Sequence, residues 1–138
     1  MTNGNAPPTT KDIGDAAHVL LTNTAVYAAQ LRAANQNAQA DAVINAHSVL
    51  IHELLQTDAQ QLQSELSNLA GPSATKLTQV TQNLDAQTTV LNHSEAMVQW
   101  VLGLADAFVN LFGAAETGAG GIAAAVEALW NQFTARPA

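Results

Sequence analysis

The stretch Ala96–Gly113, AMVQWVLGLADAFVNLFG, is apolar around almost the whole circumference of a helix. Its polar residues Gln99, Asp106 and Asn110 recur, together with Gly103, at spacings that place them on one narrow stripe of that helix. So much apolar surface must be buried in a core, against a partner chain or in a bilayer. The stretch therefore predicts an all-α fold, and its surroundings determine what the protein does.

The pattern that ends in this stretch begins after Gly71-Pro72. From Leu77 to Phe112 a seam of mainly apolar residues recurs at alternating steps of three and four, with polar residues near its middle at Gln87 and Ser94, and it predicts a long helix over residues 73–112. Residues 15–70 contain no Gly and no Pro, so another long helix is predicted over residues 12–70. Because Gly-Pro ends a helix and the connection is short, the two are expected to form a long antiparallel helical hairpin.

The weakest point of the first predicted helix is Asn35-Gln36-Asn37. Asparagine side chains compete with the helix for backbone hydrogen bonds and favour caps and turns. A helix that continues through this tripeptide gives the long hairpin, whereas a break there gives an arrangement like a four-helix bundle. The sequence leaves these two alternatives open.

The ends of the chain differ from its middle. Residues 1–11 are rich in Asn, Pro and Thr and are expected to form a flexible arm, with a single helical domain over residues 12–138. The glycine-rich segment 113–121 is expected to be a mobile hinge. A short amphipathic helix is predicted over residues 122–134 after it.

The composition favours association between copies. Of the 138 residues, 48% are hydrophobic and only 11% are charged, compared with about 25% charged residues in ordinary domains. A surface with so few charges repels its neighbours weakly, and protein interfaces are depleted in such charges. We therefore expect a homo-oligomer, with a monomer of neutral surface as the alternative.

The charge balance and the terminus restrict the other partners. The net charge is −7 and there are four basic residues, so no nucleic-acid partner is expected. The absence of cysteine excludes disulfides, thiolate catalysis and cysteine-based zinc sites. Residues 1–12 lack an apolar signal core, which predicts a cytoplasmic protein or export without a leader.

The histidines raise the question of a metal or pH-sensitive site. If the hairpin turns at Gly71-Pro72, His52 lies opposite His93, with Glu53 and Glu95 close by. Two histidines and two carboxylates are a metal-ligand set, and a pair of neighbouring histidines is also suited to a contact that changes near pH 6. The simpler interpretation is that both histidines are solvated, so no metal or other cofactor is expected.

No catalytic constellation is identifiable in the sequence. It contains no Ser–His–Asp arrangement, no paired catalytic carboxylates and no phosphate-binding glycine loop after a strand. We therefore expect a protein that is not an enzyme and has no small-molecule substrate.

The apolar residues of the C-terminal part are the predicted interface with a second copy or a membrane. Packing within a monomer core is the competing interpretation, because aromatic residues also pack between helices. The stripe of Gln99, Asp106 and Asn110 is expected to face water or, if the region inserts into a bilayer, to line a pore. The predicted interface residues are Met97, Trp100, Val101, Leu104, Phe108, Phe112, Ile122, Val126, Leu129, Trp130 and Phe133.

The segment YAAQLRAANQNAQADAVINA, residues 27–46, adds a resemblance to a known family. In its Ala, Asn and Gln content it is similar to the killing-trait proteins that build R-body ribbons. The resemblance implies a self-associating structural subunit of a ribbon, a filament or another homo-oligomer. A membrane-active protein that inserts its C-terminal hairpin is the second hypothesis, and a bundle that binds a cofactor through His52 and His93 is the third.

Overall fold

The computed structural model describes residues 8–69, 71–117 and 121–137. Every regular element in these ranges is an α-helix, so the all-α prediction is confirmed. The helices are α1 (Thr10–Ala33), α2 (Asn37–Gln56), α3 (Ala59–Ser67), α4 (Gly71–Thr89), α5 (Glu95–Thr117) and α6 (Gly121–Thr134).

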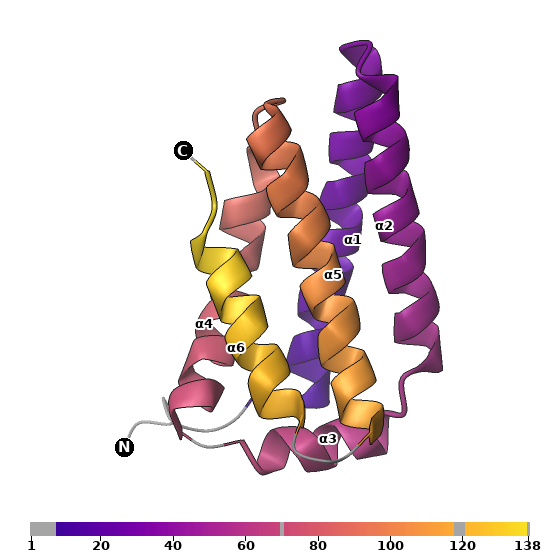
Figure 1. Ribbon diagram of the computed structural model, residues 1–138. Coiled ribbons are helices and arrows are strands. Elements are labelled where there is room, and N and C mark those ends of the chain that lie inside the picture. Colours follow the sequence, from indigo (N-terminus) through magenta and orange to yellow (C-terminus); the bar gives the residue numbers. More distant parts are fainter. Residues whose placement is uncertain (1–7, 70, 118–120, 138) are drawn as a thin grey trace.

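The long helices run up and down beside one another, and the short α3 lies across one end of the bundle (Figure 1). Helix α1 packs against α2 and α4, and α5 packs against α2 and α6. Helix α4 also contacts α6, which closes the bundle on the side away from α2. The result is a bundle-like arrangement with two helical hairpins, α1–α2 and α5–α6.

The continuous helix expected over residues 12–70 is wrong, because the chain turns at Asn35. This residue has a positive φ of 65°, a left-handed conformation that asparagine tolerates better than most residues. The backbone N–H of Gln36 donates to the carbonyl of Leu31 at 2.8 Å, and that of Asn35 donates to Arg32 at 3.0 Å. These two bonds form a Schellman motif, which ends α1 and satisfies its last carbonyls.

A second break, between α2 and α3, also differs from the continuous helix predicted over residues 12–70. Thr57 has an extended backbone (φ −70°, ψ 131°). Asp58 then begins the next helix, because its Oδ1 accepts hydrogen bonds from the backbone N–H groups of Gln60 and Gln61 at 2.9 and 3.2 Å. A side-chain cap of this kind needs neither glycine nor proline.

The helix expected over residues 73–112 is also divided in two, by residues 90–94. Ser94 caps α5 by accepting a hydrogen bond on its Oγ from the backbone N–H of Met97 at 3.1 Å. Helix α3 packs mainly against α5, and α4 packs mainly against α1 and α6. The single long hairpin turning at Gly71-Pro72 is therefore replaced by shorter helices that surround one core.

The predictions for the two ends are confirmed in part. The helix expected over 122–134 is present as Gly121–Thr134. Residues 113–117 of the expected hinge continue α5, and residues 118–120 lie outside the described residues. In the expected arm, α1 already begins at Thr10 and is capped by Thr9 through a capping box with Asp12, whereas residues 1–7 lie outside the described residues.

Candidate functional site

The apolar C-terminal residues predicted as an interface are packed inside the chain. Ten of them are at most 9% exposed, and Trp130 is half-buried against the same core. In this conformation they offer little surface to a second copy or to a membrane. The ten buried residues are Met97, Trp100, Val101, Leu104, Phe108, Phe112, Ile122, Val126, Leu129 and Phe133.

Polar contacts hold α5 and α6 together within this core. The indole Nε1 of Trp100 donates to the carbonyl of Gln132 at 2.7 Å, and the Nε2 of Gln132 donates back to the carbonyl of Trp100 at 3.0 Å. This reciprocal pair leaves no room for a side chain at Gly103, where an added Cβ would lie 2.5 Å from the Nε2 of Gln132. The glycine therefore permits the close approach of α6 to α5.

Two basic residues connect this hairpin to α4. The Nζ of Lys76 lies 2.8 Å from a carboxylate oxygen of Glu127 on α6. Beyond α6, Arg136 donates from Nε to the carbonyl of Gln87 at 2.9 Å and from Nη2 to that of Val90 at 2.7 Å. These carbonyls lie at the end of α4, where backbone acceptors lack helical partners. Both contacts oppose separation of α5–α6 from the bundle.

The polar stripe of α5 faces water, as expected. Gln99, Asp106 and Asn110 are all exposed, and the Nδ2 of Asn110 lies 3.4 Å from the Oδ2 of Asp106. The carboxylate of Asp106 therefore contacts water, although it lies in the most apolar stretch of the sequence, and the fold does not have to bury its charge.

The expected pairing of His52 with His93 is wrong. His93 lies beside Tyr27, with ring centroids 6.1 Å apart, and its carbonyl accepts a hydrogen bond from the side chain of Gln36 at 3.1 Å. His52 lies 16 residues after Gln36, which is about 24 Å along α2. Among the residues that the structure describes, no three His, Asp or Glu side chains are grouped so that they could hold a metal ion.

Glu53 has a carboxylate neighbour other than the one expected. Burial raises the pKa of Glu53 above its ordinary value, and the adjacent carboxylate of Glu116, at the end of α5, raises it further. The nearby His52 acts in the opposite direction but is the weaker influence. Protonation of this pair would remove a repulsion between α2 and α5.

The apolar surface that remains exposed lies mainly on the first hairpin. On α2, Ile44, Ile51 and Leu55 are 43%, 37% and 80% exposed. Their spacing of seven and four residues places them on one side of the helix, which we call the α2 ridge. Sequence analysis missed it because these residues are fewer and more widely spaced than the apolar residues of α5.

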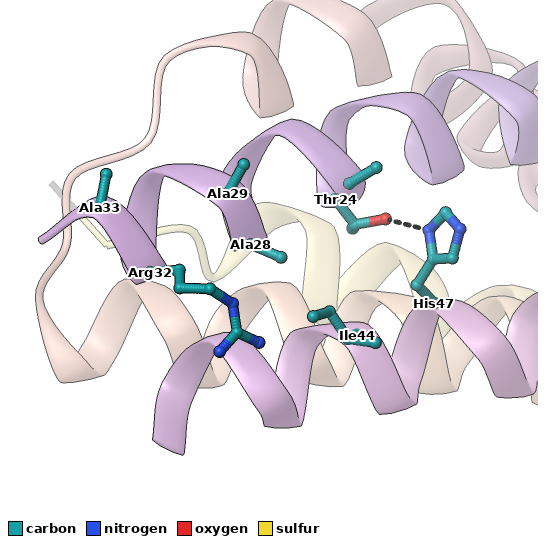
Figure 2. A pocket seen from close by; sticks show the side chains of 8 residues that line it. Thr24, Ala28, Ala29, Arg32, Ala33, Ile44 and His47 are labelled. Atoms are coloured by element: carbon teal, nitrogen blue, oxygen red, sulfur yellow. Dashed lines mark hydrogen bonds between the residues drawn. The ribbon is translucent and has the colours of Figure 1, made fainter. Parts of the chain in front are cut away.

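A groove adjoins this ridge between α1 and α2. It has a volume of about 600 Å³ and contains Ala28 and Ile44, which point into the space between the helices (Figure 2). Ala25, Ala29 and Ala33 form its α1 side at steps of four residues. Because alanine side chains are short, they leave space beside α1, and an apolar side chain of another molecule could fit into that space.

Polar groups define the two ends of the groove. At one end, the Oγ1 of the buried Thr24 lies 3.1 Å from the Nδ1 of His47 (Figure 2). At the other end, Arg32 forms an ion pair with Asp41 at 2.7 Å, and both side chains are largely exposed. Since this pair neutralises itself, the groove carries no uncompensated charge. We call the α2 ridge and this groove together the hairpin face.

Comparisons with known proteins give no relative for this chain. No protein-family model matches it, and neither does any curated protein or solved structure. The interpretation of the hairpin face therefore depends on its own geometry and chemistry.

Proposed function

We propose that this protein is a non-enzymatic helical subunit that associates with other copies of itself, and that the copies meet through the hairpin face. The observation that carries the proposal is the exposure of Leu55, which at 80% is the most exposed large apolar side chain among the residues that the structure describes. Ile44 and Ile51 continue the same apolar surface along α2. Exposed apolar residues that share one side of a helix mark an interaction site more often than isolated exposed residues do.

The energetics favour an apolar contact on this face. Complete burial of a Leu or Ile side chain contributes about 1.5–3 kcal/mol relative to leaving it in water. Leu55 would approach the full value, whereas Ile51 has less exposed surface to lose. Association also costs translational and rotational freedom. A contact built on these three residues would therefore be of moderate strength and would depend on protein concentration.

The distribution of charge supports a second copy as the partner. Between residues 16 and 56, the charged side chains are Arg32, Asp41 and Glu53, and the first two neutralise each other. A strongly charged partner would lose hydration there without finding an opposite charge. A second hairpin face is equally neutral, so it offers apolar surface without that cost.

The proposal is tested by the molar mass of the wild type and of two matched variants, measured by size exclusion with light scattering over a range of concentrations. The wild type should exceed the 14.3 kDa of one chain as concentration rises. Leu55→Asp should remain monomeric, because a charge on the ridge would have to be desolvated.

Val90→Asp is the control, since Val90 is 76% exposed but lies in the connection between α4 and α5, outside the hairpin face. It should associate like the wild type. A wild type that stays monomeric throughout, or a loss of association in both variants, would contradict the proposal. Circular dichroism of each variant verifies that its helices are retained.

Membrane insertion is the second candidate function, and one observation favours it. The segment Glu95–Glu116 is long and apolar enough to cross a bilayer, although 56% of its most apolar window is buried in the fold. Insertion would require α5 and α6 to leave the bundle, which breaks the contacts of Lys76 and Arg136 with their partners. Replacing both residues with Ala should then increase leakage of a dye from liposomes. Absence of leakage from the wild type and from this variant would rule the candidate out.

A further inference from the structure

The hairpin face has two unlike halves along its length. Thr24 and His47, which are hydrogen-bonded across the hairpin, mark its middle. Toward the α3 end of α2 lie Ile51 and Leu55 of the ridge. Toward the turn at Asn35 lies the groove with its alanine side. One half thus projects apolar side chains, and the other half has the space to receive them.

The two halves lie at matching distances from the middle. Ile51 and Leu55 come 4 and 8 residues after His47, about 6 and 12 Å along α2. Ala29 and Ala33 come 5 and 9 residues after Thr24, about 8 and 14 Å along α1. Because the two helices are antiparallel, these displacements point in opposite directions from the hydrogen-bonded pair.

From this match we infer that two copies pair through their hairpin faces in antiparallel orientation, about a two-fold axis near Thr24 and His47, with the ridge of each copy against the groove of the other. The inference rests on the proposed self-association and specifies its geometry. A two-fold contact uses the same surface on both copies, so each surface is consumed when one pair has formed. The assembly through this face therefore stops at a dimer, and a ribbon or filament would need a second surface.

The size of the face is sufficient for such a dimer. Twenty residues of helix extend about 30 Å, and two neighbouring helices are about 20 Å wide, which gives a footprint of about 600 Å² on each copy. The total of about 1,200 Å² is at the lower end of the range for specific interfaces. The few charges on the face reduce the cost of removing water from it.

Single cysteines test this arrangement, because the natural chain contains none. Each variant is treated with a short bismaleimide, which links thiols that lie within about one helix diameter of each other. Ser48 is exposed and lies one residue from His47, close to the proposed axis. Ser48→Cys should therefore form covalent dimers with itself.

Leu55→Cys should not link to itself, because the two copies of residue 55 would be about 24 Å apart along the helices. It should link to Ala33→Cys when the two variants are mixed. The mixture of Leu55→Cys with Val90→Cys is the matched control and should give no product, since Val90 is exposed but lies off the face.

The outcomes separate the geometry from the proposed function. Efficient linking of Leu55→Cys to itself would indicate parallel pairing and overturn the inference while leaving self-association intact. Association by light scattering without any of these products would also overturn the inference and place the contact on another surface. A chain that is monomeric by light scattering would overturn the proposed function and the inference together.

Discussion

The two hairpins of this protein differ in whether their large apolar side chains are buried. The α5–α6 hairpin contains the most apolar stretch of the sequence, yet Phe108 and Phe112 are completely buried and the hairpin is bonded to α4 through Lys76 and Arg136. The α1–α2 hairpin is more polar, yet it leaves Leu55 exposed. Exposure therefore does not follow from the apolar content of a helix. It depends on whether another part of the fold packs against each side of the helix. Among the described residues, no element packs against the outer side of α2.

The comparison predicts its largest effect for the removal of one large side chain from each hairpin. Phe108→Ala should lower the free energy of unfolding by about 3–5 kcal/mol, because it leaves a cavity in the core. Leu55→Ala should change it by no more than about 0.5 kcal/mol in dilute solution, since little packing is lost. Urea unfolding followed by circular dichroism measures both. Similar losses in the two variants would show that Leu55 is packed within the monomer.

Alanine substitutions of two arginines, Arg136 and Arg32, should show the same contrast between the hairpins, with smaller losses of stability. Arg136 donates to two carbonyls at the end of α4 and lies 5.7 Å from the ring centroid of Trp100. Arg136→Ala should cost about 1.5–3 kcal/mol, in the range of hydrogen bonds made by charged groups. Arg32→Ala removes an exposed ion pair with Asp41 and should cost no more than about 1 kcal/mol.

Thermal and urea unfolding of the two alanine variants check this order, and Arg136→Lys separates charge from geometry. Lysine keeps the charge but cannot reach both carbonyls with a planar fork, so it should recover only part of the loss. Equal stability of Arg136→Ala and the wild type would mean that this residue does not hold α5–α6 to α4.

Alanine substitutions of two glycines of α5 test how closely α6 packs against that helix. An added Cβ at Gly113 meets nothing within 4 Å, so Gly113→Ala should stabilise the protein by about 0.5–1 kcal/mol through helix propensity. Gly103→Ala brings the same propensity but displaces Gln132 from its hydrogen bond with Trp100. It should therefore be clearly less stable than Gly113→Ala. Melting temperatures of the two variants give the comparison, and an equal gain in both would contradict the close contact of α6 with Gly103.

The smallest predicted effect is a dependence of stability on pH that arises at the contact between α2 and α5. Since burial and Glu116 raise the folded-state pKa of Glu53 above its ordinary value near 4.5, the folded chain holds this proton more tightly than the unfolded chain does. The stability that Glu53 contributes is therefore present below its ordinary pKa and is lost as the pH rises through the raised pKa.

Glu53→Gln should consequently raise the melting temperature at pH 7 and have less effect near pH 4. Melting curves of the variant and the wild type across this range measure the difference. A benefit that does not change with pH would mean that the repulsion from Glu116 is not what the substitution relieves.

The sequence predicted the helices better than their ends. The step pattern of α4 and α5 and the absence of Gly and Pro from residues 15–70 indicated helix correctly. The break at Asn35 was an open alternative because asparagine is suited to it. The only sequence signal of the break at Thr57-Asp58 was that the side chain of Asp58 can cap a helix. Aspartate also occurs within helices, so this signal is weak. Local sequence does not determine which of these caps is used, because packing of the separated helices decides it.

The candidate site could not be predicted from the sequence, for a related reason. Pairing His52 with His93 assumed one hairpin, whereas the additional turns place His93, in the connection between α4 and α5, beside Gln36 at the start of α2, and His52 lies near the other end of that helix. The hairpin face depends on Ala25, Ala29 and Ala33 being beside Ile44, residues that belong to different helices. Their steps of four were visible in the sequence, but which side of each helix the core covers depends on the whole bundle.

Hydroxyl-radical footprinting of the wild type at low and high protein concentration tests the contrast between the hairpins most directly, because it reports on both in one sample. The account predicts that Ile51 and Leu55 are labelled at low concentration and become protected at high concentration. Met97 and Trp100, which are reactive but only 1% and 3% exposed, should remain unlabelled at both concentrations. Constant labelling of Leu55, together with labelling of Met97 and Trp100 that decreases as concentration rises, would contradict the account and show that the C-terminal hairpin joins the copies.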